Sequence, residues 1–574
     1  MGLLRAVATA ALFVGPLSWL RRSSKLSAGW HPLLLLCAWA LTVFIAGLSG
    51  HLVVGVVTIV ATSVAILVRE LLLDRANVVA TLREPALLVF AVSVLLLTVL
   101  LHGQLFTHYD NFSHWALVVS VMLDDNAFPA PADDVVGFTT YPLGGAGLPY
   151  LANLLLGRAE WVSMLAHSTF IVSCALPLTC ATGRRWAAGL ALYAVAVVAL
   201  LTHVTSPASL LVDALVAGLG GALLTLVLLH RTEILLQPWP LAVVGATLVT
   251  VKSSGVFFVA IVLVLSVLLL RRSWARSDRR WRSGAAWATT LAAPWVLWWL
   301  WGRHVQATFP AADESKHSVS VSRFEAVLGA KTGADLRSIL GDFLGKVLLD
   351  GWLWLLLSAL LLAGALAVRS GSIEARDHRR VLFVMLTTAL LWEVSLALMY
   401  LLSMPLGEAL KLAGFRRYQG TIHLVIMVVL LALVATWWAS TPRLATGQVA
   451  VAALVMAIPL TLTSPRGVVY LPDQHLRVAL QSALAGVVVT PQDRVCLLQE
   501  GTDGGYRTWM TRFILNHQDV RPIVVKPDAT RLPKRLGACE VTILLDPRPH
   551  TLDLARLAGV PVSAQTELPM VITP

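Results

Sequence analysis

Long runs of apolar residues alternate with short polar segments along most of this chain. Ala86–Leu101 and Val256–Leu270 are two such runs, and each consists almost entirely of apolar side chains. A helix needs about 20 mostly apolar residues to cross the hydrocarbon core of a bilayer. The runs lack the regular alternation of apolar and polar residues that marks a barrel strand. They therefore predict membrane-spanning helices.

This pattern predicts about 14 spans. Only helices and closed barrels satisfy every backbone polar group in lipid, so residues 1–463 are expected to form an all-α polytopic bundle. The predicted spans are 3–20, 29–49, 51–68, 86–104, 160–182, 186–203, 207–229, 239–252, 254–270, 285–302, 346–368, 381–402, 419–438 and 447–463.

Composition supports a membrane protein and limits its partners. The 574 residues are 57% hydrophobic and only 13% charged, against about 25% charged in soluble domains. So few charges cannot cover a soluble protein of this length. The net charge is +12, which fits Lys and Arg anchors beside membrane spans. No basic soluble surface is evident, so a nucleic-acid partner is not expected.

Basic residues gather in short loops that fall on a single face in the predicted order of spans. Lys and Arg accumulate on the cytoplasmic side of membrane proteins, so this face is predicted to be cytoplasmic. The outer face then receives the long polar loops 105–150, 303–345 and 403–419. The basic clusters are 21–25, 69–83, 184–185, 271–282 and 369–380.

The last part of the chain, 464–574, has a different pattern and is predicted to be a small soluble α/β domain outside the cytoplasm. DRVCLLQEG, RPIVVKP and CEVTILLD are typical of buried strands, with helical segments TWMTRFILNH and TLDLARLAG between them. This alternation predicts a parallel sheet. Cys496 and Cys539 fit either a disulfide or two free thiols. The Gly-rich stretch Glu500–Tyr506 lacks a phosphate-binding pattern and is interpreted as a strand-to-helix turn.

Candidate chemistry begins in the first outer loop, where Asp110 and His114 directly follow an apolar span. Ionisable groups at a membrane boundary are functional candidates. Asp110 is a candidate general base, and in an α-helix His114 would share its face. The alternative is a solvated carboxylate and an interfacial histidine.

Acidic pairs at 124–125 and 133–134 fit a divalent cation or hydrated surface charges. Tyr141 is a candidate interfacial aromatic.

Two ionisable residues fall within or between apolar spans. Asp213 lies in the predicted span 207–229, and Lys252 separates two short apolar halves. A charge inside the bilayer costs at least about 2.5 kcal/mol on insertion scales, so Asp213 should face protein or water. Lys252 lies near the outer face on this topology. It fits either a lipid phosphate ligand or a side chain that extends to the interface.

The predicted outer face also contains Arg416, Arg417 and Tyr418, although basic residues generally favour the cytoplasmic face. A guanidinium matches the geometry of a phosphate group, so this pair is a candidate phosphate-binding element. Glu408 and Lys411 precede it, and pairing with these neighbours is the simpler alternative.

Five motifs in order resemble a family of bacterial polytopic proteins. They are YDNFSHW (Tyr109–Trp115), YPLGG (Tyr141–Gly145), VDALVAG (Val212–Gly218), VKSSG (Val251–Gly255) and FRRYQG (Phe415–Gly420). The family carries a WDEFSHW-like first loop and is similar to the C-type glycosyltransferase superfamily. In this chain Tyr and Asn replace the usual Trp and Glu of the first motif, so its second acid is missing.

The resemblance implies a multi-pass enzyme of the bacterial plasma membrane that transfers a sugar from a polyprenyl-phosphate donor to a glycan or lipid acceptor of the cell envelope. It implies Asp110 as the base, assisted by His114, and Lys252, Arg416 and Arg417 as ligands of the donor phosphate. The displacement would invert the anomeric carbon. No cofactor is implied, and a divalent cation stays open.

Two other functions fit the pattern. A transporter or lipid flippase would use Asp213 and Lys252 along a polar path, although internal repeats typical of transporters are not evident. A non-catalytic assembly protein for envelope polymers would tolerate loss of Asp110.

Overall fold

The architecture is described from a computed structural model of the whole chain. The description covers residues 2–133, 136–183, 186–274, 280–310, 321–371, 373–440, 474–485, 487–490, 492–500, 503–516, 519–525, 538–544 and 570–572.

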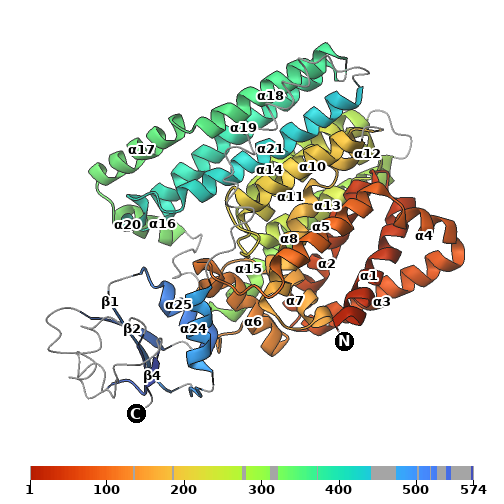
Figure 1. Ribbon diagram of the computed structural model, residues 1–574. Helices are drawn as coiled ribbons and strands as arrows, with labels where there is room; N and C mark the ends of the chain where they lie inside the picture. Colours follow the sequence, from red (N-terminus) through yellow and green to blue (C-terminus); the bar gives the residue numbers. More distant parts are fainter. Residues whose placement is uncertain are drawn as a thin grey trace.

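A bundle of long helices forms the main body (Figure 1). Short π-helical turns, Asn111–Trp115 and Met399–Ser403, interrupt it at two places. The helices are α1 (Gly2–Ser23), α2 (His31–Leu48), α3 (Leu52–Leu73), α4 (Arg75–Leu82), α5 (Pro85–Leu101), α6 (Ala116–Asp125), α7 (Gly144–Leu156), α8 (Glu160–Ala175), α9 (Leu178–Ala181), α10 (Trp186–Thr202), α11 (Asp213–Leu229), α12 (Arg231–Leu236), α13 (Trp239–Val251), α14 (Gly255–Trp274), α15 (Arg280–Thr308), α16 (Val321–Gly329), α17 (Gly333–Leu348), α18 (Gly351–Arg369), α19 (Ala375–Leu398), α20 (Leu406–Ala409) and α21 (Phe415–Ser440).

The chain is a helical membrane protein with several spans. Within the described residues, 7 helices are long and apolar enough to cross a bilayer, or 8 when the bent pair α4 and α5 counts as one. Four shorter apolar helices, α10, α11, α13 and α14, accompany them. Every predicted span except 447–463 overlaps a helix, and that one lies outside the described residues. The full count of spans stays a prediction.

The predicted outer loops contain more helix than the polar pattern indicated. Residues 105–150 include α6 and most of α7, and α7 packs against α2 and α8. The apolar side chains of Leu117–Met122 are almost all buried, which explains why this short stretch is helical without being a span. Helices α16 and α17 lie in 303–345, and α20 lies in 403–419.

Helix α11 is the centre of the bundle. All its residues from Asp213 to Leu228 are buried, and it contacts α8, α10, α13, α14 and α21. Small residues allow the closest approaches: a Cβ placed on Gly221 would lie 2.7 Å from Cβ of Val428 on α21. Lipid provides no hydrophobic force between helices, so close packing at small residues holds such pairs together.

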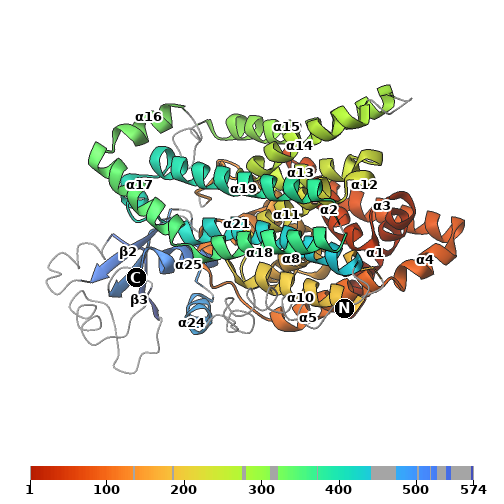
Figure 2. The same cartoon turned by 90° about the horizontal axis from the view of Figure 1, so that it is seen from above.

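Helices from two of the three predicted outer loops lie at one end of the bundle. Helices α16, α17 and α20 and the C-terminal domain gather at one end, and α4 and α12 lie at the other (Figures 1 and 2). Which end faces the cytoplasm stays a prediction.

The C-terminal segment contains α24 (His475–Leu484), α25 (Tyr506–Leu515) and a four-stranded sheet of order β2-β1-β3-β4. The strands β1 (Val495–Glu500), β2 (Val520–Val525) and β3 (Val541–Leu544) are parallel as predicted. The edge strand β4 (Met570–Ile572) is antiparallel, which corrects the expectation of a purely parallel sheet.

Two features of this domain bear on the sequence interpretation. Cys496 and Cys539 form a disulfide, which is typical of oxidising compartments. Gly504 and Gly505 have positive φ and lead into α25, as a strand-to-helix turn requires. The predicted helix TLDLARLAG and the domain boundary at 464 lie outside the described residues.

The C-terminal domain packs against the first outer loop. Phe112 is fully buried, with its ring centroid 5.9 Å from that of Tyr506 and 5.5 Å from that of Phe513 on α25. The Tyr506 hydroxyl donates to the Thr107 carbonyl at 2.7 Å. Arg477 of α24 pairs with Glu160 at 2.7 Å. The domain therefore directly supports the segment that carries Asp110.

The close contact of α11 with α21 predicts a stability effect. We expect Gly221→Ala to lower the stability by about 1–3 kcal/mol, because its methyl group would displace Val428. Gly302→Ala is the matched control, since a Cβ there meets no atom within 4 Å. Thermal unfolding of both variants in detergent measures the effect, and equal melting temperatures would contradict the packing described.

Candidate active site

The five motifs that carried the sequence resemblance meet at the end of the bundle near the C-terminal domain. Lys252 stands at the break between α13 and α14, with an extended backbone (φ −159°, ψ 142°). Gly255 begins α14 so close to the Leu248 carbonyl that a side chain would clash with it. This glycine explains why the VKSSG segment can turn sharply and leave Lys252 facing the bundle.

Asp213 begins α11 instead of lying within a span, which corrects the sequence expectation. The chain through Pro207 is not helical, so the helix starts at Asp213. A carboxylate in the first turn of a helix is stabilised by the backbone dipole. Its side chain is only 4% exposed, and a buried charge of this kind requires a partner.

Two cations share the Asp213 carboxylate. Lys252 Nζ donates to Oδ1 at 2.7 Å, and Arg417 Nε lies 3.7 Å from Oδ2. Arg417 also forms an ion pair with Asp110 through its terminal nitrogen NH1. The result is a continuous chain of alternating charges, Lys252–Asp213–Arg417–Asp110, drawn from four separate segments of the sequence.

Tyr418 is placed between the two cations of this chain. The Arg417 guanidinium lies 5.2 Å from its ring centroid and Lys252 Nζ lies 5.4 Å from it, and Arg417 also donates to its hydroxyl at 3.3 Å. Attraction between a cation and an aromatic face holds both side chains in place. Tyr418 therefore packs between Arg417 and Lys252, and its part in a functional site stays a prediction.

Asp110 directly precedes the π-helical turn of the first loop. Its backbone N–H donates to Nδ1 of His108 at 3.1 Å, and its side chain is 24% exposed. Burial lowers the pKa of His108, and the nearby Asp110 carboxylate opposes this effect. A neutral His108 fits the hydrogen bond that it accepts.

His114 lies among aromatic rings. It is buried, with its ring centroid 5.1 Å from that of Tyr141 and 4.6 Å from that of Trp115. In a π-helix the hydrogen bonds join residues five apart, so a spacing of four does not align Asp110 and His114 as an α-helix would. Its role beside Asp110 stays a prediction.

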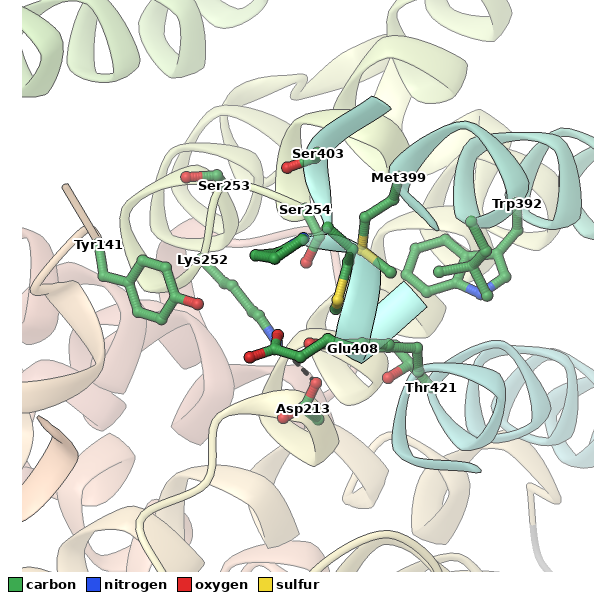
Figure 3. A pocket seen from close by; sticks show the side chains of 14 residues that line it. Tyr141, Asp213, Lys252, Ser253, Ser254, Trp392, Met399, Ser403, Glu408 and Thr421 are labelled. Atoms are coloured by element: carbon green, nitrogen blue, oxygen red, sulfur yellow. Dashed lines mark hydrogen bonds and ion pairs between the residues drawn. The ribbon is translucent and has the colours of Figure 1, made fainter. Parts of the chain in front are cut away.

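A pocket of about 750 Å³ opens beside Lys252 and Asp213 (Figure 3). One part of its wall is polar, with Ser253, Ser254 and Glu408 near the ion pair. The other part is apolar. The apolar and aromatic lining residues are Tyr141, Trp392, Leu396, Met399, Met404, Pro405 and Tyr418.

Arg416 and Arg417 differ in whether they reach the charged groups beside the first pocket. Both line a second cavity of about 1300 Å³, together with His108 and His203. Arg416 is exposed there and does not line the pocket of Lys252. Arg417 reaches from this cavity to Asp213. The structure thus brings Asp110, Asp213, Lys252, Arg417, Tyr418 and Tyr141 together and leaves Arg416 on the other side.

The described residues contain no group of three or more His, Cys, Asp or Glu side chains suited to a metal ion. Asp110 and Asp213 already pair with Arg417, and Asp124 of the first acidic pair bonds Arg158 at 2.6 Å. Residue 134 of the second pair lies outside the described part. A divalent cation would have to displace one of these partners or take a ligand from a substrate.

Sequence reasoning missed several residues of the cavity walls. Trp392 and Met399 lie within or just after α19, where they resemble any lipid-facing apolar residue. Asp350 and His423 line a third cavity, and the only signal for them is a polar residue at the start of or inside an apolar span. Glu408 was noted only as a neighbour of Arg416.

No family model matches the chain, and no curated protein matches it. Among solved structures it is similar to ArnT from Cupriavidus metallidurans in the apo state, with 16% identity and a TM-score of 0.43 over 82% of this chain and 94% of that one. ArnT from the same organism bound to undecaprenyl phosphate gives 15% identity and a TM-score of 0.44 over 84% and 96%. A likeness of this degree does not define an activity or a site in this chain.

The charge chain predicts unequal effects of two carboxylate substitutions. We expect Asp213→Asn to lower the stability by about 3–5 kcal/mol, because Lys252 and Arg417 would be left without their buried partner. Asp110→Asn should lower it by about 1 kcal/mol or less, since this pair is more exposed. Thermal unfolding in detergent tests this, and an equal loss in both variants would show that Asp213 is not the central partner.

Proposed function

We propose that the protein is a membrane glycosyltransferase that moves a sugar from a polyprenyl-phosphate donor to an acceptor at the outer face of the bacterial plasma membrane. The observation that supports this most is the charge chain Lys252–Asp213–Arg417–Asp110. It begins in the pocket beside Lys252 and reaches, through Arg417, the cavity on the other side. A transfer reaction needs such an arrangement, with two binding spaces meeting at one set of charged groups.

The pocket beside Lys252 fits the donor. Its polar wall offers an ammonium and the hydroxyls of Ser253 and Ser254 to a phosphate, and its apolar wall offers Trp392 and Leu396 to an isoprenoid chain. A phosphate lipid combines the same two properties. Because Arg417 reaches Asp213 beside this pocket and Arg416 has no such contact, we assign the donor phosphate to Lys252 and Arg417.

Asp110 is the base in this proposal. An acceptor hydroxyl transfers its proton to the Asp110 carboxylate, and its oxygen bonds to the anomeric carbon of the sugar. The bond from that carbon to the phosphate oxygen breaks, and its electron pair leaves with the lipid phosphate. A single displacement of this kind inverts the anomeric configuration. Arg417 holds the carboxylate in place, while its other contact, to Asp213, keeps the guanidinium fixed.

The leaving lipid phosphate gains one negative charge, and the site holds cations in position to stabilise it. Lys252 and Arg417 are fixed by Asp213 before the reaction, so little reorganisation is needed as the charge develops. Fixed charges in a site that excludes water are worth more than charges in solution. In this proposal both cations serve the role that a divalent cation has in other phosphate chemistry.

The acceptor is a glycan or lipid of the envelope, and the C-terminal domain supports the segment that carries the base. This domain packs on the segment that carries Asp110, through Phe112 and Thr107. We infer that it lies outside the cytoplasm and supports the base. Its disulfide fits that location.

Loss of the base should abolish transfer. We expect Asp110→Asn to lower the rate at least about 100-fold, since general base catalysis typically contributes that much. The assay follows radiolabelled sugar from undecaprenyl-phosphate-linked sugars, tested as a panel, to envelope fractions of cells that lack the protein. Asp124→Asn is the matched control, since Asp124 lies in the same loop and pairs only with exposed Arg158 among the ion pairs described.

The outcome also separates the alternatives. Retained transfer in Asp110→Asn would remove Asp110 as the base. If the wild-type protein binds the lipid and moves it between leaflets of a vesicle without sugar transfer, the flippase interpretation replaces the enzyme.

Donor binding supplies a separate test. Undecaprenyl phosphate is the probe, and native mass spectrometry measures its occupancy. We expect Lys252→Met to reduce the affinity at least about 10-fold through loss of a charged contact. Arg337→Met is the control, because Arg337 is an exposed cation on α17.

Lys252→Met also removes one ion-pair partner of the buried Asp213 carboxylate and could therefore disturb folding. A second variant controls for this effect. Met404→Trp fills the apolar wall of the same pocket without touching a charge, and it should block the lipid as well. Unchanged affinity in Met404→Trp would place the lipid elsewhere.

A further inference from the structure

A third cavity of about 1500 Å³ lies between α10, α17, α18 and α21. It shares His203, Lys346, Phe415 and Arg416 with the cavity that Arg417 lines, so the two are neighbouring parts of one space. Three polar residues of α21 form one wall: Arg416, Gln419 and His423. They are spaced three and four residues apart, which places them on one face of the helix.

A buried hydrogen-bonded relay forms the floor of this cavity. His423 Nε2 lies 2.8 Å from Oδ2 of Asp350, and His423 Nδ1 lies 3.2 Å from Nε2 of His203. The His423 side chain is 7% exposed and the Asp350 side chain is 10% exposed. Asp350 also caps α18 by accepting from the backbone N–H of Leu353 at 3.3 Å.

The relay has a defined direction. An ionised Asp350 only accepts, so His423 Nε2 must donate to it. When His423 carries a single proton, on Nε2, its Nδ1 accepts from Nε2 of His203. This leaves Nδ1 of a neutral His203 with a lone pair that can accept a hydrogen bond.

The charge chain at Arg417 does not use these groups. Burying a carboxylate and two imidazoles inside a helical membrane protein costs free energy that packing alone does not require. All three line the third cavity, and His203 alone of the three also lines the neighbouring one. The relay therefore ends where a ligand can reach it.

We propose that this cavity is the acceptor subsite, and that the relay Asp350–His423–His203 holds the His203 ring to accept a hydrogen bond from a hydroxyl of the glycosyl acceptor. The inference rests on the proposed function. His203 is a positioning residue: it binds a hydroxyl of the acceptor, while Asp110 removes the proton of the reacting hydroxyl.

The other groups of the cavity fit a hydroxylated ligand. Trp352 offers an aromatic face, with its ring centroid 5.5 Å from that of His203. Arg416, Lys346 and Asp342 offer charged donors and an acceptor around the mouth. No carboxylate lies within ion-pair distance of Arg416 or Lys346 in the described part of the chain, so their donors are available to a ligand.

Chemical labelling tests this subsite without relying on turnover. Diethyl pyrocarbonate modifies neutral imidazoles, and mass spectrometry of peptides measures the rate at each histidine. We expect a lipid and glycan extract of the envelope to slow modification of His203 at least about 5-fold in the full-length protein. Exposed His51 is the internal control and should not change. Undecaprenyl phosphate alone should leave the His203 rate unchanged.

Two variants connect the relay to the acceptor. His203→Gln keeps an N–H for His423 but loses the ring acceptor. Asp350→Asn keeps the cap of α18 but removes the charge that orders the relay. In the transfer assay we expect both to raise the half-saturating amount of envelope fraction at least about 5-fold, while donor affinity and the maximal rate change less than about 2-fold.

Each failure has a separate meaning. If the extract does not protect His203 of the wild-type protein, the subsite is wrong whether or not sugar is transferred. Protection by undecaprenyl phosphate alone would assign the cavity to the donor and overturn the proposal. If the extract protects His203 but the wild-type protein transfers no sugar, the proposed function fails and the cavity remains a binding site for envelope material.

Discussion

The buried carboxylate of Asp213 is the interaction on which the site depends. It is nearly inaccessible, and it is held by Lys252 from the α13–α14 break and by Arg417 from the start of α21. A charge in this position is stable only with partners, and each partner is in turn fixed by it. Through Arg417 the same carboxylate positions Asp110 of the first loop. Four distant segments of chain are thereby tied together at one end of the bundle.

This network divides the space around it. On one side lies a mostly apolar pocket with a polar side at Lys252, suited to a lipid phosphate, and on the other lie wider cavities with more polar walls. The α21 helix separates them: Tyr418 faces the first pocket, while Arg416 and His423 face the others. The first turns of α21 thus supply side chains to both binding spaces. The C-terminal domain closes this end of the molecule by packing on the Asp110 segment.

Hydrophobic patterning predicted most of the helices because a bilayer demands long apolar segments and satisfied backbones. The pattern was less informative where short helices are buried by protein. Helices α6 and α7 were expected as a polar loop, since neither is long enough to span and their apolar residues pack against neighbouring helices. The strands β1 to β3 were recognisable as apolar runs. The antiparallel edge strand was not, because it is short and its direction follows from the connection.

For the site, the sequence alone determined which residues were unusual: an acid after a span, a lysine between two apolar halves and arginines on the wrong face. These are visible locally because charge in or beside an apolar run has a clear energetic cost. Only the tertiary structure decided which of them meet. It joined Arg417 to Asp110 and Asp213. It left Arg416 facing another cavity and placed His114 among aromatic rings. It also paired Asp350 with His423. Such pairings depend on helix rotation and on close packing at residues far apart in the chain, which no local pattern records.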